Sequence, residues 1–283
     1  MGFGLLCAAL GACASLATFD QPEAASQEPL QVAARSETLW DIASALPEGA
    51  GAWQYRYFPG KQPTQFSYQP LDGRVAIQAK SLKSASMLRR QLRIQPDALG
   101  ALGWISFSWK VPTLIAGADM AQREADDAPV RLVLAFDGDR AKFSAKNALL
   151  SELSQALTGE PMPFATLMYV WDAERAPGSV IINPRTDRIR KLVVESGRAH
   201  LGQWRNYQRD VAADYRLAFG DVPGALVGLA LMTDTDNTGT HAEAWYGPVT
   251  LSPVPRVNWQ VPAHLDTAAV SFTDDDSLVL WGD

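Results

Sequence analysis

The sequence predicts a mainly β protein, a jelly-roll-like antiparallel β-sandwich with one or two short helices. Many short segments alternate apolar and polar residues, and turn-forming residues separate them. The chain also holds nine tryptophans, seven tyrosines and ten phenylalanines, and strands favour aromatic side chains. Its 283 residues are 47% hydrophobic and no Pro/Ser/Gly linker divides the middle, so one large core is expected over residues 38–253.

The first residues predict an export signal rather than a folded element. Phe3–Leu10 is apolar but too short to span a bilayer. It runs into a Leu-Gly-Ala-Cys sequence that ends at Cys13 and resembles the bacterial lipoprotein box, although Ala12-Cys13-Ala14 also fits an ordinary secretion site. No basic residues precede the apolar run, which leaves a cytosolic terminus as a third interpretation. We expect a leader over 1–13, lipidation of Cys13 and a flexible tether over 14–37.

The residues after Cys13 bear on location. Ser15, two positions later, is not the aspartate that would favour retention in the inner membrane. We therefore expect an outer-membrane lipoprotein that faces the periplasm, with a soluble periplasmic protein as the alternative. Membrane contact is expected only through the lipid anchor.

The predicted elements begin with a short helix at residues 39–45, before Pro47, and strand signals start at Trp53. Gln65–Leu71 and Arg74–Lys80 flank an Asp-Gly pair at 72–73. This arrangement predicts a hairpin, because Asp-Gly accommodates the positive φ angles of a primed turn.

The stretch Trp104–Val111 alternates most regularly, with Ile105, Phe107, Trp109 and Val111 on one face and Trp104 on the other. The apolar face is expected in the core. Further strands are expected at Val130–Phe136, Leu167–Trp171, Val180–Ile182, Ile189–Ser196, Leu226–Thr233 and Ala242–Leu251.

Two segments carry apolar residues at helical spacing. Ala148–Leu157 places Leu150, Leu153 and Leu157 on one side and is followed by Gly159, while Asn206–Phe219 has Val211, Tyr215 and Phe219 four residues apart and is followed by Gly220. Both stripes are expected to pack against a sheet, and both glycines to end their helices. Residues 254–283, which contain three consecutive aspartates, are expected to form an acidic extension outside the sandwich.

Charge and reactive residues exclude several functions. The net charge is −6 with no basic block, which disfavours nucleic acid as a partner. Both cysteines lie within the first thirteen residues, so the body has no thiol, and the three histidines are far apart in sequence, which disfavours a zinc site. No nucleophile elbow, dinucleotide-binding glycine motif or Walker loop is present.

The turn from Asp234 to Gly239 concentrates oxygen donors, which Ca²⁺ prefers. Asp234, Asp236 and Asn237 are the candidate metal ligands. The turn begins like an EF-hand loop, but Trp245 stands where the closing glutamate would be, so a complete EF-hand is excluded. The simpler interpretation is a tight turn whose Asp, Asn and Thr side chains bond their own backbone.

Asp126 and Asp127 precede the strand that contains Arg131. Paired carboxylates can act as acid and base, but neighbours in an extended segment point opposite ways. Each therefore needs a partner, for which Glu124, Asp214 and Asp234 are candidates. A solvated acidic loop, or a structural pairing with Arg131 or Arg209, is the alternative.

Tryptophans suggest sugar stacking, because pyranose rings lie well on exposed indoles. Trp109 shares its face with Ile105 and Phe107 and is expected in the core. Trp104, on the opposite face, is the candidate for ligand contact.

Several motifs together resemble the bacterial domain-of-unknown-function family numbered 3047. The likeness covers Trp53 to Leu251, and its most specific part is Met232–Asn237 followed by Tyr246-Gly247. The other motifs are Lys80-Ser81, Ser84-Ala85-Ser86, Trp104–Trp109, Asp126-Asp127 with Arg131, Tyr169-Val170-Trp171, Ser196-Gly197, Asp214-Tyr215 and Phe219-Gly220. The resemblance implies an exported proteobacterial β-rich module. It supplies no catalytic residues, because the family has no established reaction.

The sequence thus predicts a binding module rather than an enzyme, with a glycan or other small polar molecule as ligand and Ca²⁺ as the candidate cofactor. The alternatives are a polysaccharide hydrolase or lyase on the same scaffold, and a non-catalytic envelope scaffold protein. The predicted ligand site consists of Trp104, Asp126, Asp127, Arg131, Asp234, Asp236 and Asn237.

Overall fold

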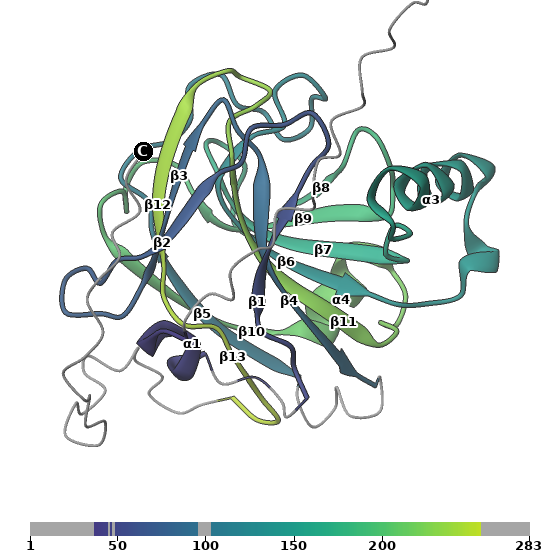
Figure 1. Ribbon diagram of the computed structural model, residues 1–283, viewed down its shortest axis with the longest axis horizontal. Helices are drawn as coiled ribbons and strands as arrows, with labels where there is room; N and C mark the ends of the chain where they lie inside the picture. The colour runs from purple at the N-terminus through teal and green to yellow at the C-terminus, as the bar shows by residue number, and fades with distance from the viewer. Residues whose placement is uncertain (1–36, 45, 47–48, 96–102, 256–283) are drawn as a thin grey trace, which may run out of the picture. The chain divides into compact units, whose positions relative to one another are not determined.

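The computed structural model describes residues 37–44, 46, 49–95 and 103–255 (Figure 1). The predicted leader with Cys13, the tether up to residue 36 and the extension from residue 256 lie outside the described residues. Within the described part, no helix is both long enough and apolar enough to cross a membrane.

Two curled sheets form a sandwich (Figure 1), which confirms the predicted fold class. All strand pairs are antiparallel except that of β7 with β9. The larger sheet has the order β1 (Trp53–Tyr57), β4 (Ser86–Ile94), β11 (Leu226–Asp234), β6 (Ala128–Phe136), β7 (Ala165–Asp172), β9 (Ile189–Ser196) and β8 (Val180–Ile182). The smaller sheet has the order β10 (Trp204–Asp210), β5 (Trp104–Lys110), β12 (His241–Tyr246), β3 (Ile77–Leu82) and β2 (Gln65–Tyr68), with β13 (Thr250–Ser252) paired to β5.

The core lies between the sheets, where alternate residues of facing strands meet. Phe107 and Trp109 of β5 are buried as predicted, and the ring of Phe107 stacks on Tyr169 of β7 with centroids 5.4 Å apart. On β6, Leu132 and Leu134 point the same way. The residues between them on the strands of the larger sheet therefore face away from this core.

The predicted hairpin is confirmed. β2 pairs with β3 in a register that joins Gln65 to Lys80 and Tyr68 to Ile77. Asp72 and Gly73 have φ angles of 53° and 73°, as a primed turn requires.

The second predicted helix begins later than its spacing suggested. Residues 204–210 form β10, which pairs with β5 along its whole length. Helix α4 (Val211–Phe219) then begins where the Asp210 carboxylate accepts a hydrogen bond from the Ala213 amide, and ends at Gly220 in the left-handed region. Strand pairing therefore overrides the helical pattern in the first residues of the segment.

Helix α3 (Ala145–Thr158) ends at Gly159 as predicted, but its leucine stripe does not pack on the sheet. Of the predicted stripe, Leu153 and Leu157 are 50% and 61% exposed and Leu150 is half-buried, while Asn147 and Ser151 are buried. The Asn147 side chain donates to Asp187 and accepts from Thr186, and Ser151 accepts from Arg140. This polar anchoring turns the leucines outward. Among the described residues, the other helices are α1 (Leu39–Ala43), which was predicted, and a short 3₁₀ turn, η1 (Arg140–Lys142).

Candidate functional site

The two predicted acidic segments meet at one end of the larger sheet. β6 begins just after Asp127 and β11 ends at Asp234, and these antiparallel neighbours pair Ala128 with Asp234. The Ala128 amide donates to the Asp234 carboxylate at 3.1 Å. Strand adjacency thus brings together residues more than a hundred positions apart in sequence.

Arg131 holds the two segments to each other. Its Nε and one terminal nitrogen donate to the two carboxylate oxygens of Asp234, both at 2.9 Å. The same terminal nitrogen donates to the Asp126 carboxylate at 3.1 Å and to the Asp126 carbonyl at 2.8 Å. Lys191 of β9 donates to Asp126 at 2.6 Å and to the Met120 carbonyl at 2.7 Å.

Asp127 fixes the aspartate-rich turn. Its carboxylate accepts from the Asn237 amide at 3.2 Å, from the Asn237 side chain at 3.0 Å and from the Thr238 amide at 2.6 Å. We call Asp126, Asp127, Arg131, Lys191 and Asp234 the ionic cluster, and each of these residues is at most 5% exposed. The alternative of a solvated acidic loop is therefore wrong, and the structural pairing of Asp126 with Arg131 is present.

Burial dominates the electrostatics of this cluster. It raises the pKa of Asp234 to about 6 against the opposing effect of Arg131. It lowers the pKa of Lys191 to about 8, and the neighbouring Arg131 charge acts in the same direction. Burial also acts to lower the pKa of Arg131, but Asp234 and Asp126 outweigh it and raise that pKa. The donors around Asp234 all fit its ionised form.

The carboxylates of Asp127, Asp234 and Asp236 offer oxygens within 4.8 Å of one another. These oxygens already have partners, however. Arg131 holds Asp234, the turn amides hold Asp127, and the Lys61 ammonium lies 2.5 Å from Asp236. Calcium takes six to eight oxygen ligands, so at this site it would have to displace two cationic side chains. In this arrangement the three carboxylates connect segments of the folded chain.

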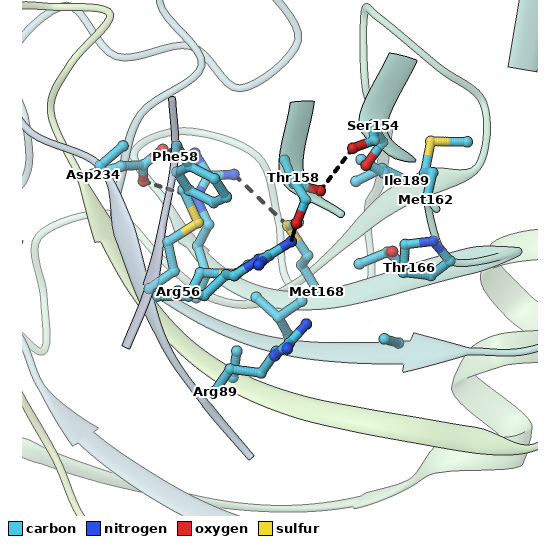
Figure 2. Close-up of a pocket in the computed structure, with 18 of the residues that line it drawn as sticks. Arg56, Phe58, Arg89, Ser154, Thr158, Met162, Thr166, Met168, Ile189 and Asp234 are labelled. Carbon is cyan, nitrogen blue, oxygen red and sulfur yellow. Dashed lines mark hydrogen bonds and ion pairs between the residues drawn. The ribbon is translucent and has the colours of Figure 1, made fainter. Parts of the chain in front are cut away.

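A cavity of about 510 Å³ lies against the outer face of the larger sheet, beside the ionic cluster (Figure 2). Asp126, Arg131, Asp234, Asp236 and Asn237 line part of it. The floor consists of outward residues of five strands, and most of them are apolar: Met87, Val133, Ala135, Met168, Ile189, Ala230 and Met232. Phe58 is the one aromatic side chain among the described residues that line it.

The wall formed by the α3–β7 connection is tied to the edge of the sheet by what we call the arginine latch, Arg56, Arg89 and Glu160. Arg89 donates to both Glu160 oxygens, at 2.6 and 3.0 Å. Arg56 of β1 reaches across the cavity and donates to the Thr158 carbonyl at 3.2 Å, with Glu160 3.7 Å away (Figure 2). The hydrogen bond from Arg89 lowers the pKa of Glu160.

The other predicted residues lie elsewhere. Trp104 does not join the acidic segments, because it is half-buried on β5 of the smaller sheet, where it pairs with Asp210 and Ser252. Asp214, one candidate partner for the aspartate pair, instead accepts from Arg209 and from the buried Tyr169 hydroxyl. Asn237 turns its amide nitrogen toward Asp127.

Sequence reasoning missed the cavity floor, the arginine latch and Lys191. A signal for the floor existed, because methionines and small residues alternate with core residues on these strands, as Ala230 and Met232 do around Leu231. Lys191 also stands out as a charged residue directly before the apolar pair Leu192 and Val193. The latch joins residues about seventy to a hundred positions apart, and no local pattern marks it.

Comparison with known proteins identifies a family. The model of the family described as Protein of unknown function (DUF3047) matches residues 51–250. The chain therefore belongs to this family, as the sequence motifs predicted. No curated protein matches the chain.

Three solved structures show weak likeness. The xyloglucanase domain of NopAA, a type three effector from Sinorhizobium fredii in complex with cellobiose, has a TM-score of 0.38 at 9% identity, over 74% of this chain and 99% of that one. Endoglucanase 3 of Trichoderma harzianum, from family GH12, has a TM-score of 0.36 at 11% identity, over 71% and 92%. The glycoside hydrolase domain of Endo-D from Streptococcus pneumoniae R6 has a TM-score of 0.30 at 8% identity, over 72% of this chain but 22% of that one. At these scores, none of them assigns an activity to this chain.

Proposed function

We propose that this member of the DUF3047 family is a binding module for a small organic ligand, held in the cavity on the larger sheet. The observation that carries the proposal is the cavity itself. Its volume of about 510 Å³ lies within the range of roughly 300–1,000 Å³ typical of small-molecule sites. An apolar floor and a few convergent polar groups at the rim are also typical of such sites.

The predicted site residues contribute one wall of this cavity rather than a separate site. Asp126, Arg131 and Asp234 are bonded to one another and are almost completely buried. Their polar atoms are already hydrogen-bonded, so they form a rigid wall and offer a ligand few free donors or acceptors. The ligand would therefore rest on the floor and contact the more accessible rim.

A glycan is the ligand class that the sequence predicted, and the rim gives it some support. Ser154, Thr158, Asn183 and Asn237 line the cavity and could bond hydroxyl groups. No tryptophan lines it among the described residues, so a sugar would have to lie on methionine and alanine. Glycans are therefore one of several ligand classes to be tested.

One observation bears on the enzyme alternative. Asp234, with its raised pKa, and Glu160, with its lowered pKa, line the same cavity, and an acid–base pair requires such a difference. The groups that hydrogen-bond the Asp234 carboxylate, however, are all donors, so a proton on this carboxylate would compete with bonds that the Ala128 amide and Arg131 already make. We therefore favour binding over hydrolysis.

The test fills the cavity. Ala135→Phe places an aromatic ring on the floor, and Ala141→Phe, at an exposed position of η1, is the matched control. The full chain is screened against glycans, organic acids and neutral lipids by thermal shift, since a ligand that binds the folded state raises the melting temperature. We expect a shift in the wild type and in Ala141→Phe, and its loss in Ala135→Phe.

Two outcomes would overturn the proposal. One is a ligand that binds Ala135→Phe as well as it binds the wild type, because binding would then lie outside the cavity. The other is the release of reducing sugar from a polysaccharide at a rate that Glu160→Gln abolishes, because the chain would then be an enzyme.

We also propose that the chain is exported and lipidated at Cys13, which supports a site that samples ligands outside the cytoplasm. Cys13→Ser should move the protein from the membrane fraction to the soluble fraction. Unchanged fractionation would contradict lipidation and leave the cavity proposal untouched.

A further inference from the structure

The chemistry of the cavity narrows the class of ligand, on the basis of the proposed function above. Four of the six methionines of the chain, Met87, Met162, Met168 and Met232, line it. Methionine is apolar, unbranched and adaptable, and it suits surfaces that accept flexible apolar groups. Val133, Ala135, Ile189 and Ala230 extend the apolar floor between them.

The charged groups of the cavity carry a surplus of positive charge. The charged side chains that line or directly back it are the cations Arg56, Lys61, Arg89, Arg131, Arg185 and Lys191 and the carboxylates Asp126, Asp127, Glu160, Asp234 and Asp236. Cations thus exceed carboxylates by one, in a protein whose net charge is −6. The cavity therefore carries a local positive charge, whereas the whole chain is negatively charged.

Among these cations, Arg56 and Arg185 are the two that have no carboxylate of their own within the described residues. Glu160 is shared by Arg89, which holds both of its oxygens, and Arg56, which lies 3.7 Å away. Arg185 donates to the Arg123 carbonyl at 3.5 Å, and no carboxylate of the described residues lies within ion-pair distance of it. A guanidinium has five N–H donors. Among the described residues, the guanidinium of Arg56 makes one hydrogen bond, which it donates to the Thr158 carbonyl.

We infer that the ligand is a small organic acid with an extended apolar body, whose carboxylate meets Arg56 and whose chain lies on the methionine floor. Arg56 points across the cavity above that floor (Figure 2). A bidentate guanidinium–carboxylate contact supplies directional binding. Burial of the chain against methionine and alanine supplies the remaining affinity.

The experiment is calorimetric titration of the full chain with four probes: decanoate, decanol, acetate and cellotetraose. Decanoate should bind more tightly than decanol, which lacks the charge, and than acetate, which lacks the chain. Arg56→Gln should weaken decanoate by about tenfold, as expected for loss of a charge-assisted hydrogen bond. It should leave decanol unchanged.

Arg93→Gln is the matched control, because Arg93 is exposed on β4, pairs with Asp137 and does not line the cavity. It should bind decanoate like the wild type. Arg185→Gln provides a second variant that does not touch the latch, so that a folding defect of Arg56→Gln cannot hide the result.

Each outcome decides between the two proposals. Equal binding of decanoate and decanol, or decanoate binding that neither arginine variant weakens, overturns the organic-acid inference. Binding of cellotetraose alone, lost in Ala135→Phe, also overturns it but keeps the binding-module proposal. If none of the four probes binds and the wider thermal-shift panel yields no cavity ligand, both proposals fall.

Discussion

The ionic cluster and the arginine latch lie beside the same cavity, but their arginine–carboxylate pairs differ in burial. In the cluster, Arg131 and its carboxylates are at most 5% exposed and are bonded to one another and to backbone atoms. In the latch, Arg56 and Arg89 are about one quarter exposed and Glu160 about two fifths. The comparison teaches that the most deeply buried charges join segments of the fold, while the partly exposed ones keep contact with the cavity.

The same substitution in both regions should give the largest contrast. Arg131→Met leaves Asp126 and Asp234 buried with Lys191 as their remaining cation, and removing one partner of a buried pair costs about 3–5 kcal/mol. Arg56→Met removes a partly exposed group and should cost about 1 kcal/mol or less. Urea unfolding measures both.

The control for lost packing is Arg90→Met on β4, a residue that does not line the cavity. Equal destabilisation by Arg131→Met and Arg56→Met would abolish the distinction between the two regions.

A second test of the ionic cluster is the pH dependence of stability that the buried Lys191 produces. Burial lowers its pKa to about 8 from the ordinary 10.5. Between these values the folded protein has released a proton that the unfolded chain still holds, so the stability from this group rises with pH and is lost as pH falls through 8. Relative to Lys191→Met, the wild type should gain up to ~3 kcal/mol over this window.

Chemical unfolding at intervals from pH 7 to pH 10.5 measures this difference. Tyrosines titrate similarly in both proteins and cancel in the comparison. Parallel curves for the two proteins would contradict the lowered pKa of Lys191.

Glu160→Gln should destabilise the protein less than Arg131→Met does, and it should strengthen decanoate binding, whereas Arg56→Gln weakens it. Loss of a partly exposed ion pair costs about 1 kcal/mol or less. The two arginines are then freed from their carboxylate, so decanoate should bind more tightly than to the wild type. Calorimetry of this variant beside Asp126→Asn, which lies in the cluster and should not tighten binding, checks the prediction. Weaker decanoate binding to Glu160→Gln would count against an open latch.

Calcium should have the smallest effect. Because Arg131 and Lys61 already neutralise Asp234 and Asp236, we expect equal melting temperatures in EDTA and in millimolar Ca²⁺. A rise with Ca²⁺ that Asp236→Ala removes would show that a metal site competes with these ion pairs.

Sequence patterns were sufficient for the sandwich, the hairpin at Asp72 and most strands, because alternation and turn chemistry are local. They also named Asp234 as one of three candidate partners for the Asp126-Asp127 pair, and adjacent strands bring these two segments together. Strand β4 was missed, because its outward face carries arginines that break the apolar pattern.

The leucine stripe of α3 is an example that local sequence patterns could not predict, because they did not show which face of the helix is buried. Leu153 and Leu157 have the spacing of a packed helix face, yet hydrogen bonds of Asn147 and Ser151 fix the opposite side to the protein. In α4, with a stripe of the same kind, Val211 and Tyr215 are buried. The difference depends on partners distant in sequence, as does the arginine latch, and neither could be predicted from one segment.

The most direct test of the account is the ¹³C-methyl NMR spectrum of the methionines during titration with decanoate. Met87, Met162, Met168 and Met232 line the cavity, whereas Met120, a residue of the loop before β6, is buried and does not line it. Ligand binding in the cavity predicts that these four methyl signals shift with one affinity and that Met120 shifts less. A saturating ligand that leaves the four signals in place, or moves Met120 most, would contradict the account.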